Sequence, residues 1–291
     1  MGKASRRSRE ARTPRPKPAP FESRPFAGLP NETDWVAMRE ILPAATAVVD
    51  IAPEHVPDGA PSEVTVATVL PLAWPGLHRA DGAVLVGTQS GSSSGDASRD
   101  LAAQVLAALS AQQGEPVTTT PPVTADSPRL QDILTAGSTF AVTVHEGFDF
   151  WVAEQELEAD AKESLERANA SIVPTVALSA LPSAYWVRIG DRAHIRLVLP
   201  EEEDTATDAI ARMHAAGQDA LGEGTRLLGA FRACGLLVPV WDLDPEKEAS
   251  DHEDELAAWG ERYRAALSDT PLTADERRAR SGLLSRQVTL R

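Results

Sequence analysis

The chain has 291 residues, of which 42% are hydrophobic, so it is long enough to build a real core in one large domain or two of common size. Its single cysteine excludes an intramolecular disulfide and a multi-cysteine zinc site, and a reducing cytoplasm is the expected compartment. No run of about 18 apolar residues occurs, so the sequence predicts no membrane span.

The formal charge of −15 is unevenly distributed. Residues 1–24 hold eight Lys or Arg and two Glu, which leaves 20 basic and 41 acidic groups, a charge of about −21, for the rest. A body this acidic repels phosphates, so we expect it not to bind DNA. Residues 1–25 are also rich in proline, which predicts a disordered basic tail. Within it, residues 2–20 are either a solubilising extension or an electrostatic contact to a protein, RNA or the ribosome.

Residues 26–62 are expected to form an N-terminal helix and strand. The helix begins with Thr33 or Asp34 as its N-cap and stops before Pro43, which cannot continue it. Residues 45–51 then have the pattern of a strand, followed by a loop.

A sequence of similar pattern occurs twice, at residues 65–89 and 175–199. Both copies open with Thr-Val-Ala, place Leu-Pro just before a tryptophan (Trp74 and Trp186) and then turn through Asp and Gly. Two apolar strands separated by such a turn indicate a β-hairpin, and the turn of the first is predicted at residues 78–82. The alternative is a chance resemblance, since apolar strand patterns are common.

The order of elements after each copy is also similar. Residues 98–111 and 205–216 have helical spacing, and residues 139–152 and 225–241 then resemble strand pairs that precede acidic helices. The predicted fold class is therefore α+β, with two related α+β units at residues 63–170 and 173–270, packed as a duplicated pair. Residues 114–128 are a surface excursion of the first unit, and residues 271–291 a basic C-terminal tail.

The small-residue loop at positions 90–95 precedes a predicted helix. Its free amides would suit an anion at the helix N-terminus, but it lacks the lysine of a nucleotide-binding loop. The simpler interpretation is a connection capped by Asp96 or Ser98.

Few residues have a pattern that suggests chemistry. His145, Glu146 and Asp149 lie close together in sequence, and His78 and Asp81 occupy the turn of the first hairpin. A histidine beside carboxylates suits acid–base catalysis, yet strand alternation separates His145 from Glu146, and the following glycine favours a turn. No second histidine lies at a workable spacing, so the sequence predicts no metal and no cofactor.

Four segments together resemble an actinobacterial family of unknown function: residues 70–74, 94–101, 144–151 and 236–241. The resemblance extends over about residues 21–270. Some members of that family carry at the N-terminus a cysteine-rich zinc motif similar to the C-terminal motif of the SecA translocase, where this chain has only its basic tail. The resemblance implies no activity and no catalytic residues.

The sequence favours a non-enzymatic cytoplasmic interaction module with an acidic body and a basic tail. One alternative is an enzyme or small-ligand-binding protein that uses the five residues around His145 and the hairpin turns. Another is an RNA- or ribosome-associated protein that binds through its tail. The oligomeric state is left open.

Overall fold

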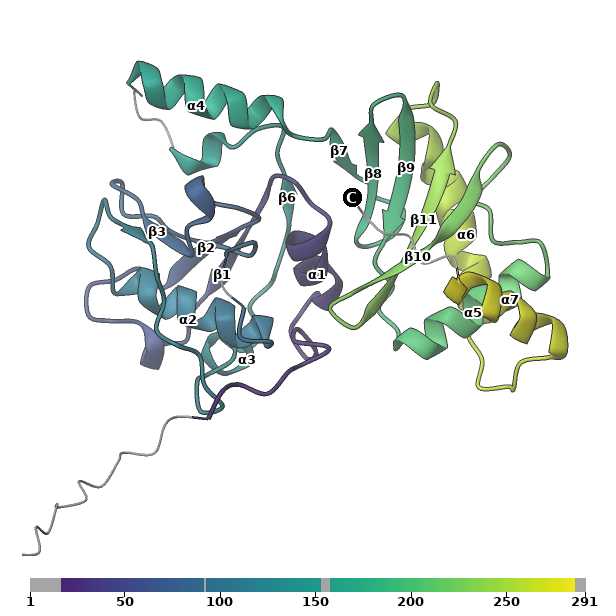
Figure 1. The fold of residues 1–291 in the computed structure, drawn as a ribbon, viewed down its shortest axis with the longest axis horizontal. Coiled ribbons are helices and arrows are strands. Elements are labelled where there is room, and N and C mark those ends of the chain that lie inside the picture. The colour runs from purple at the N-terminus through teal and green to yellow at the C-terminus, as the bar shows by residue number, and fades with distance from the viewer. Residues whose placement is uncertain (1–16, 92, 153–157, 286–291) are drawn as a thin grey trace, which may run out of the picture.

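A computed structural model describes residues 17–91, 93–152 and 158–285. The described chain folds into two β-sheets with helices packed on them, which confirms the predicted α+β class (Figure 1). Within these ranges no helix combines the length and apolar character that crossing a membrane requires.

The first sheet is built from the N-terminal half of the chain. Its strand order is β5-β3-β4-β2-β1-β6. In chain order the helices and strands of this half are α1 (Glu32–Glu40), β1 (Ala45–Asp50), β2 (Glu63–Ala67), β3 (Gly76–His78), β4 (Val84–Gly87), α2 (Ala97–Leu109), β5 (Pro116–Val117), α3 (Leu130–Ile133) and β6 (Thr143–Val144).

Helix α2 covers one face of this sheet. It begins where the sequence predicts, because the Asp96 carboxylate accepts hydrogen bonds from the backbone N–H groups of the next turn. Its Leu101 and Val105 share a core with Val84 and Val86 of β4. Alternation along β4 turns the intervening Leu85 to the other face, where it belongs to a separate small cluster.

The second sheet is built from the C-terminal half and is antiparallel throughout. Its strand order is β10-β11-β9-β8-β7. In chain order the elements are α4 (Ala159–Ala170), β7 (Thr175–Ala177), β8 (Ala184–Ile189), β9 (Arg192–Leu197), α5 (Glu203–Ala215), β10 (Arg226–Ala233), β11 (Leu236–Leu243), α6 (Glu253–Ala266) and α7 (Ala274–Ser285). Helices α5, α6 and α7 pack on one face around Trp241 and Trp259, whereas α4 buries none of its residues.

Helix α1 lies between the two sheets (Figure 1). Its buried Trp35 and Met38 belong to the core of the first sheet, and the same core continues to Tyr185 of β8 and Val238 of β11. Asp34 of α1 is also hydrogen-bonded across to the second half. The core of the first sheet therefore extends to the second half, with α1 between them, and the second sheet also has a core of its own.

The expected duplication is wrong at the level of strand order. In the first copy β2 pairs with β4 in parallel and β3 lies on the far side of β4, whereas in the second β7 pairs with β8 antiparallel. The connections after the first strand of each copy differ. Residues 68–75 lead from β2 past the position of β4 to β3, whereas residues 178–183 lead from β7 directly to the neighbouring strand β8. Trp74 accordingly lies half-buried in a link, and Trp186 lies buried within β8.

The later strand pairs also differ from each other. Residues 225–241 form the predicted hairpin, β10–β11. Residues 139–152 do not, because among the described strands β6 pairs only with β1, and the chain then enters a short 3₁₀ helix, Asp149–Trp151. The excursion at residues 114–128 supplies the edge strand β5 of the first sheet.

Arg24 joins the two halves at the N-terminal end of the body. Its Nε donates to Glu32 Oε1 at 2.6 Å, and its Nη2 donates to the carbonyl oxygen of Pro200 at 3.1 Å. The guanidinium also pairs with Glu202. Residues 17–25 therefore contact the body and are not part of a disordered tail, whereas residues 1–16 of the predicted tail lie outside the described residues.

The predicted C-terminal tail contains the ordered helix α7. Arg280 pairs at 2.6 Å with both Asp204 and Asp208 of α5, and Leu283 is buried in the second core. Residues 271–285 are consequently part of the body, and residues 286–291 lie outside the described residues.

Candidate functional site

His145 lies on the face of the first sheet opposite α2. Its Nε2 is 2.7 Å from the hydroxyl oxygen of Thr46 on β1, and its ring centroid is 5.0 Å from that of Phe150. Burial lowers the pKa of His145, and the charge of Asp149 partly opposes this effect. The imidazole is therefore held in place by a strand and an aromatic ring.

The two carboxylates predicted to act with His145 do not bond to it. Glu146 and Asp149 are both exposed, and no hydrogen bond within the described ranges joins either one to the imidazole. A Cβ atom at Gly147, which lies between them, would be 2.5 Å from the Asp149 carboxylate, so a larger residue there would require this exposed side chain to move.

His78 and Asp81 diverge from each other. His78 Nδ1 is 2.9 Å from the carbonyl oxygen of Ala111, just beyond the end of α2. Asp81 accepts hydrogen bonds from Nε and Nη2 of Arg79, and these bonds hold the pKa of Asp81 below its usual value. Arg79 also donates to the carbonyl oxygen of Phe150 at 2.7 Å, on the opposite face of the sheet from α2. The five predicted residues are thus divided between the two sides of the first sheet.

The segment around His145 acts as a cover for that sheet. Phe148 stacks on Trp151 with ring centroids 4.4 Å apart, and the Trp151 indole N–H donates to the carbonyl oxygen of Val69 at 2.8 Å. Phe150 and Trp151 pack against the small cluster that includes Leu85. Nowhere in the described ranges do three or more His, Cys, Asp or Glu side chains gather closely enough to hold a metal ion.

The start of α2 is occupied by carboxylates of the chain itself. Asp96 caps the amides of Ser98 and Arg99, and Asp100 accepts from the backbone N–H of Ser94 at 3.0 Å. These contacts support the interpretation of residues 90–95 as a capped connection. An anion at the same place would meet two negative charges.

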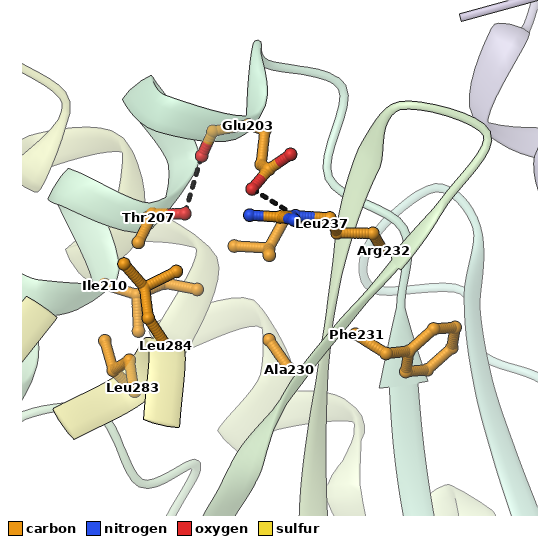
Figure 2. A pocket seen from close by; sticks show the side chains of 9 residues that line it. All are labelled: Glu203, Thr207, Ile210, Ala230, Phe231, Arg232, Leu237, Leu283 and Leu284. Carbon is orange, nitrogen blue, oxygen red and sulfur yellow. Dashed lines mark hydrogen bonds and ion pairs between the residues drawn. The ribbon is translucent and has the colours of Figure 1, made fainter. Parts of the chain in front are cut away.

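A small pocket lies where α7 meets α5 and β10. Figure 2 shows Ile210, Leu283 and Ala230 around it, with the ion pair between Glu203 and Arg232 at its rim. Its volume of about 20 Å³ is enough for roughly one water molecule. It is a packing seam between helix and sheet.

Two open grooves are larger, and several charged side chains line each of them. One, of about 390 Å³, lies between residues 21–25 and the turn that joins β10 to β11. The other, of about 500 Å³, lies beside His214 and Asp219, whose side chains are 2.7 Å apart and connect the end of α5 to the loop that follows.

A cavity of about 280 Å³ lies between α6, the end of β9 and the start of α1. We call it the interface cavity, because α1 belongs to the first half and the other elements to the second. Most of its wall is apolar, including Leu181, Leu199 and Trp259, and its polar side chains are those of Thr33, Glu201, Tyr263 and Arg264.

The aromatic wall of the interface cavity follows from the sequence of α6. Trp259 and Tyr263 are four residues apart, so they lie on the same face of the helix, and their rings stack with centroids 5.0 Å apart. Gly260 between them allows Leu181 to approach closely, because a Cβ atom at this position would lie 2.7 Å from a Leu181 methyl group.

A carboxylate and a phenol lie on the rim of the cavity. The Tyr263 hydroxyl donates to Glu201 Oε2 at 2.7 Å. Burial raises the pKa of Tyr263, and the hydrogen bond to Glu201 and its negative charge raise it further. Tyr263 therefore keeps its proton and acts as a donor.

A second polar group fixes α1 next to the cavity. The Ser183 hydroxyl donates to Asp34 Oδ1 at 2.5 Å and lies 2.7 Å from the Thr33 hydroxyl. Ser183 has a φ of 54°, a left-handed conformation that is strained for a residue other than glycine. Burial raises the pKa of Tyr185, whose hydroxyl also faces Asp34 at 3.4 Å.

Sequence reasoning missed the interface cavity. Its wall combines residues from positions 33, 181–182, 197–201 and 259–264, and these segments are distant in sequence. The local signals that point to it are the spacing of Trp259 and Tyr263 and the Leu-Pro pair at residues 181–182.

The chain matches a family of unknown function, DUF5926, over residues 25–291, and it belongs to this family. This match confirms the resemblance to a family of unknown function, while its actinobacterial range and its zinc motif remain expectations from the sequence. Neither the comparison with curated proteins nor the comparison with solved structures gave a match.

Proposed function

We propose that this protein is a non-enzymatic cytoplasmic binding module, and that the interface cavity is its binding site for a small ligand with an apolar body. The observation that carries this proposal is the cavity itself. At about 280 Å³ it is close to the lower end of the roughly 300–1,000 Å³ range of small-molecule pockets. An apolar wall with a few convergent polar groups is the usual composition of such sites.

The chemistry of the wall favours binding over catalysis. The described side chains that line the cavity include no histidine, cysteine or lysine. Its phenol is held protonated, and the Ser183 hydroxyl is hydrogen-bonded to the Asp34 carboxylate and to no imidazole of the described chain that could receive its proton.

The position of the cavity suits a ligand that stabilises the contact between the halves. Thr33 comes from α1 and Trp259 from α6, so a bound molecule would touch both halves at once. A ligand that binds only the folded state adds to its stability by mass action.

The test uses the neutral fluorescent dye prodan and a graded pair of substitutions, Gly260→Ala and Gly260→Leu. Each adds side-chain volume against Leu181 within the cavity. Alanine also favours a helix over glycine by about 1 kcal/mol, so the smaller variant is expected to fold. The matched controls are Gly282→Ala and Gly282→Leu on α7, where a Cβ atom would meet no atom within 4 Å.

We expect saturable binding of prodan to the wild type, weaker binding to Gly260→Ala and none to Gly260→Leu, with both Gly282 variants like the wild type. Circular dichroism checks that each variant is folded. Equal affinity in all five proteins, or no saturable binding to the wild type, contradicts the proposal.

A second candidate function is suggested by the charge of the N-terminus. The residues before Lys17 include six Lys or Arg and one Glu, and the body that follows is acidic. Residues 2–20 are proposed to make an electrostatic contact to RNA or the ribosome, because Lys and Arg side chains release the counterions that surround phosphates. Arg24 does not belong to this contact, since its guanidinium is engaged by carboxylates of the body.

A further inference from the structure

We propose that the ligand of the interface cavity is a small primary amine with an aromatic or branched aliphatic body, and that its ammonium group pairs with Glu201. This inference rests on the proposed function, because it assigns a ligand class to the same cavity.

The first support is that Glu201 has an available acceptor. Its Oε2 accepts from Tyr263, and no hydrogen bond or ion pair within the described ranges engages Oε1. A carboxylate on an apolar wall loses part of its hydration, and a cation that donates a hydrogen bond compensates for that loss.

The second support is that the nearby cations are engaged elsewhere. Arg264 lines the same cavity but pairs with Glu261 at 2.7 Å. Arg24, which bonds to the neighbouring Pro200, pairs with Glu32 and Glu202. Within the described part of the chain, Glu201 has no basic partner of its own.

The wall beside Glu201 suits the rest of such a ligand. Trp259 and Tyr263 stack on each other and are almost fully buried, so they close the inner wall of the cavity. Leu181 and Leu199 supply apolar surface for the body of the ligand. A short amine with one ring or one branched chain therefore fits both the volume and the polarity of the cavity.

The net charge of the whole chain also favours an amine ligand. The sequence carries 43 acidic and 28 basic side chains, for a formal net charge of −15. A negative field of this kind attracts cations to the surface and repels anions. The net charge therefore attracts an amine toward the protein more than a carboxylate of the same shape, and Glu201 favours the amine within the cavity.

The test compares three ligands that share an indole ring and differ in the charge of the substituent at its 3-position: tryptamine, neutral 3-methylindole and the anion indole-3-acetate. Each is titrated against full-length protein with prodan bound, and displacement of the dye gives its affinity. We expect tryptamine to bind about tenfold more tightly than 3-methylindole and indole-3-acetate to bind most weakly.

The variant Glu201→Gln isolates the role of the carboxylate. Its prodan affinity is measured as the reference, and its preference for tryptamine over 3-methylindole should be about tenfold smaller than that of the wild type. Glu166→Gln is the control, because it removes the same charge from the exposed face of α4. High salt should weaken tryptamine binding to the wild type more than to Glu201→Gln.

The outcomes separate this inference from the proposed function. If prodan binds and is displaced equally by tryptamine and 3-methylindole, the ligand class is wrong and the binding site stands. If tryptamine is preferred but Glu201→Gln keeps that preference, the assignment of Glu201 is wrong. If prodan does not bind to the wild type, the binding site fails and the ligand class fails with it.

Discussion

Tyr263 donates its hydroxyl hydrogen to Glu201 at 2.7 Å, and this bond joins α6 to the segment that follows β9. The other tyrosine, Tyr185, has a comparable environment, with its hydroxyl 3.4 Å from Asp34. The chain contains these two tyrosines and no more. Burial, followed by a neighbouring carboxylate, raises the pKa of both phenols.

Alkaline titration should therefore show no ordinary tyrosine in the folded protein. An unfolded tyrosine ionises near pH 10. Because the folded pKa values are higher, the folded state holds more protons above that pH, and the stability that these groups contribute is complete below pH ~10 and falls as the pH rises. Phenolate absorbance measured together with circular dichroism should change only as the protein unfolds. Tyrosines that titrate near pH 10 in a protein with native dichroism would show that the phenols are not buried.

The two tryptophans of the repeated pattern should differ in their effect on stability. Trp186 is 3% exposed, and its replacement by alanine should cost about 3–5 kcal/mol of unfolding free energy. Trp74 is half-buried in the link after β2, so its replacement should cost less, roughly 1–3 kcal/mol. Chemical denaturation measures both values. Trp186→Phe is a useful control, because the Trp186 indole N–H has no hydrogen-bond partner in the described chain. Equal losses of unfolding free energy for Trp74→Ala and Trp186→Ala would indicate that the two tryptophans occupy equivalent positions.

Replacing Arg24 should weaken the connection between the halves. Arg24→Ala removes partly buried bonds to Glu32 and an exposed bond to Pro200, and it leaves the Glu32 carboxylate without its partner, at a cost of roughly 1–3 kcal/mol. Arg278→Ala removes an ion pair with Asp275 in which both side chains are about three quarters exposed, so it should change stability by less than about 1 kcal/mol. Urea denaturation of the two variants gives the comparison. A midpoint for Arg24→Ala no lower than that of Arg278→Ala would mean that this contact does not hold the halves together.

Deleting residues 2–16 should remove any binding to RNA. This deletion takes away Lys3 and five arginines but stops before Lys17, whose carbonyl oxygen accepts a hydrogen bond from Ala125. Binding to a labelled single-stranded RNA and its salt dependence should be lost, while the melting temperature stays near that of the full chain.

Deletion of residues 2–24 is compared with the shorter deletion. It also removes Arg24, so it should lower the melting temperature in addition to abolishing RNA binding. RNA binding that persists without residues 2–16 would assign it to the body, against the charge argument.

The sequence by itself determined most of the helices and strands of this protein. The signals are local: Asp96 caps α2, and Pro43 follows α1 closely. Each acts within a few residues through a hydrogen bond or a missing N–H, so it can be recognised without knowing the rest of the fold.

Only the tertiary structure decided which strands pair and where the cavity lies. An apolar period shows which face of a strand is buried but not which partner covers it, so two similar stretches of sequence form a parallel pair in one half and an antiparallel pair in the other. The interface cavity depends on the same long-range choices, because Thr33 and Trp259 meet only when α1 is enclosed between the two sheets. Contacts between segments this distant are set by packing of the whole core, and no local pattern encodes them.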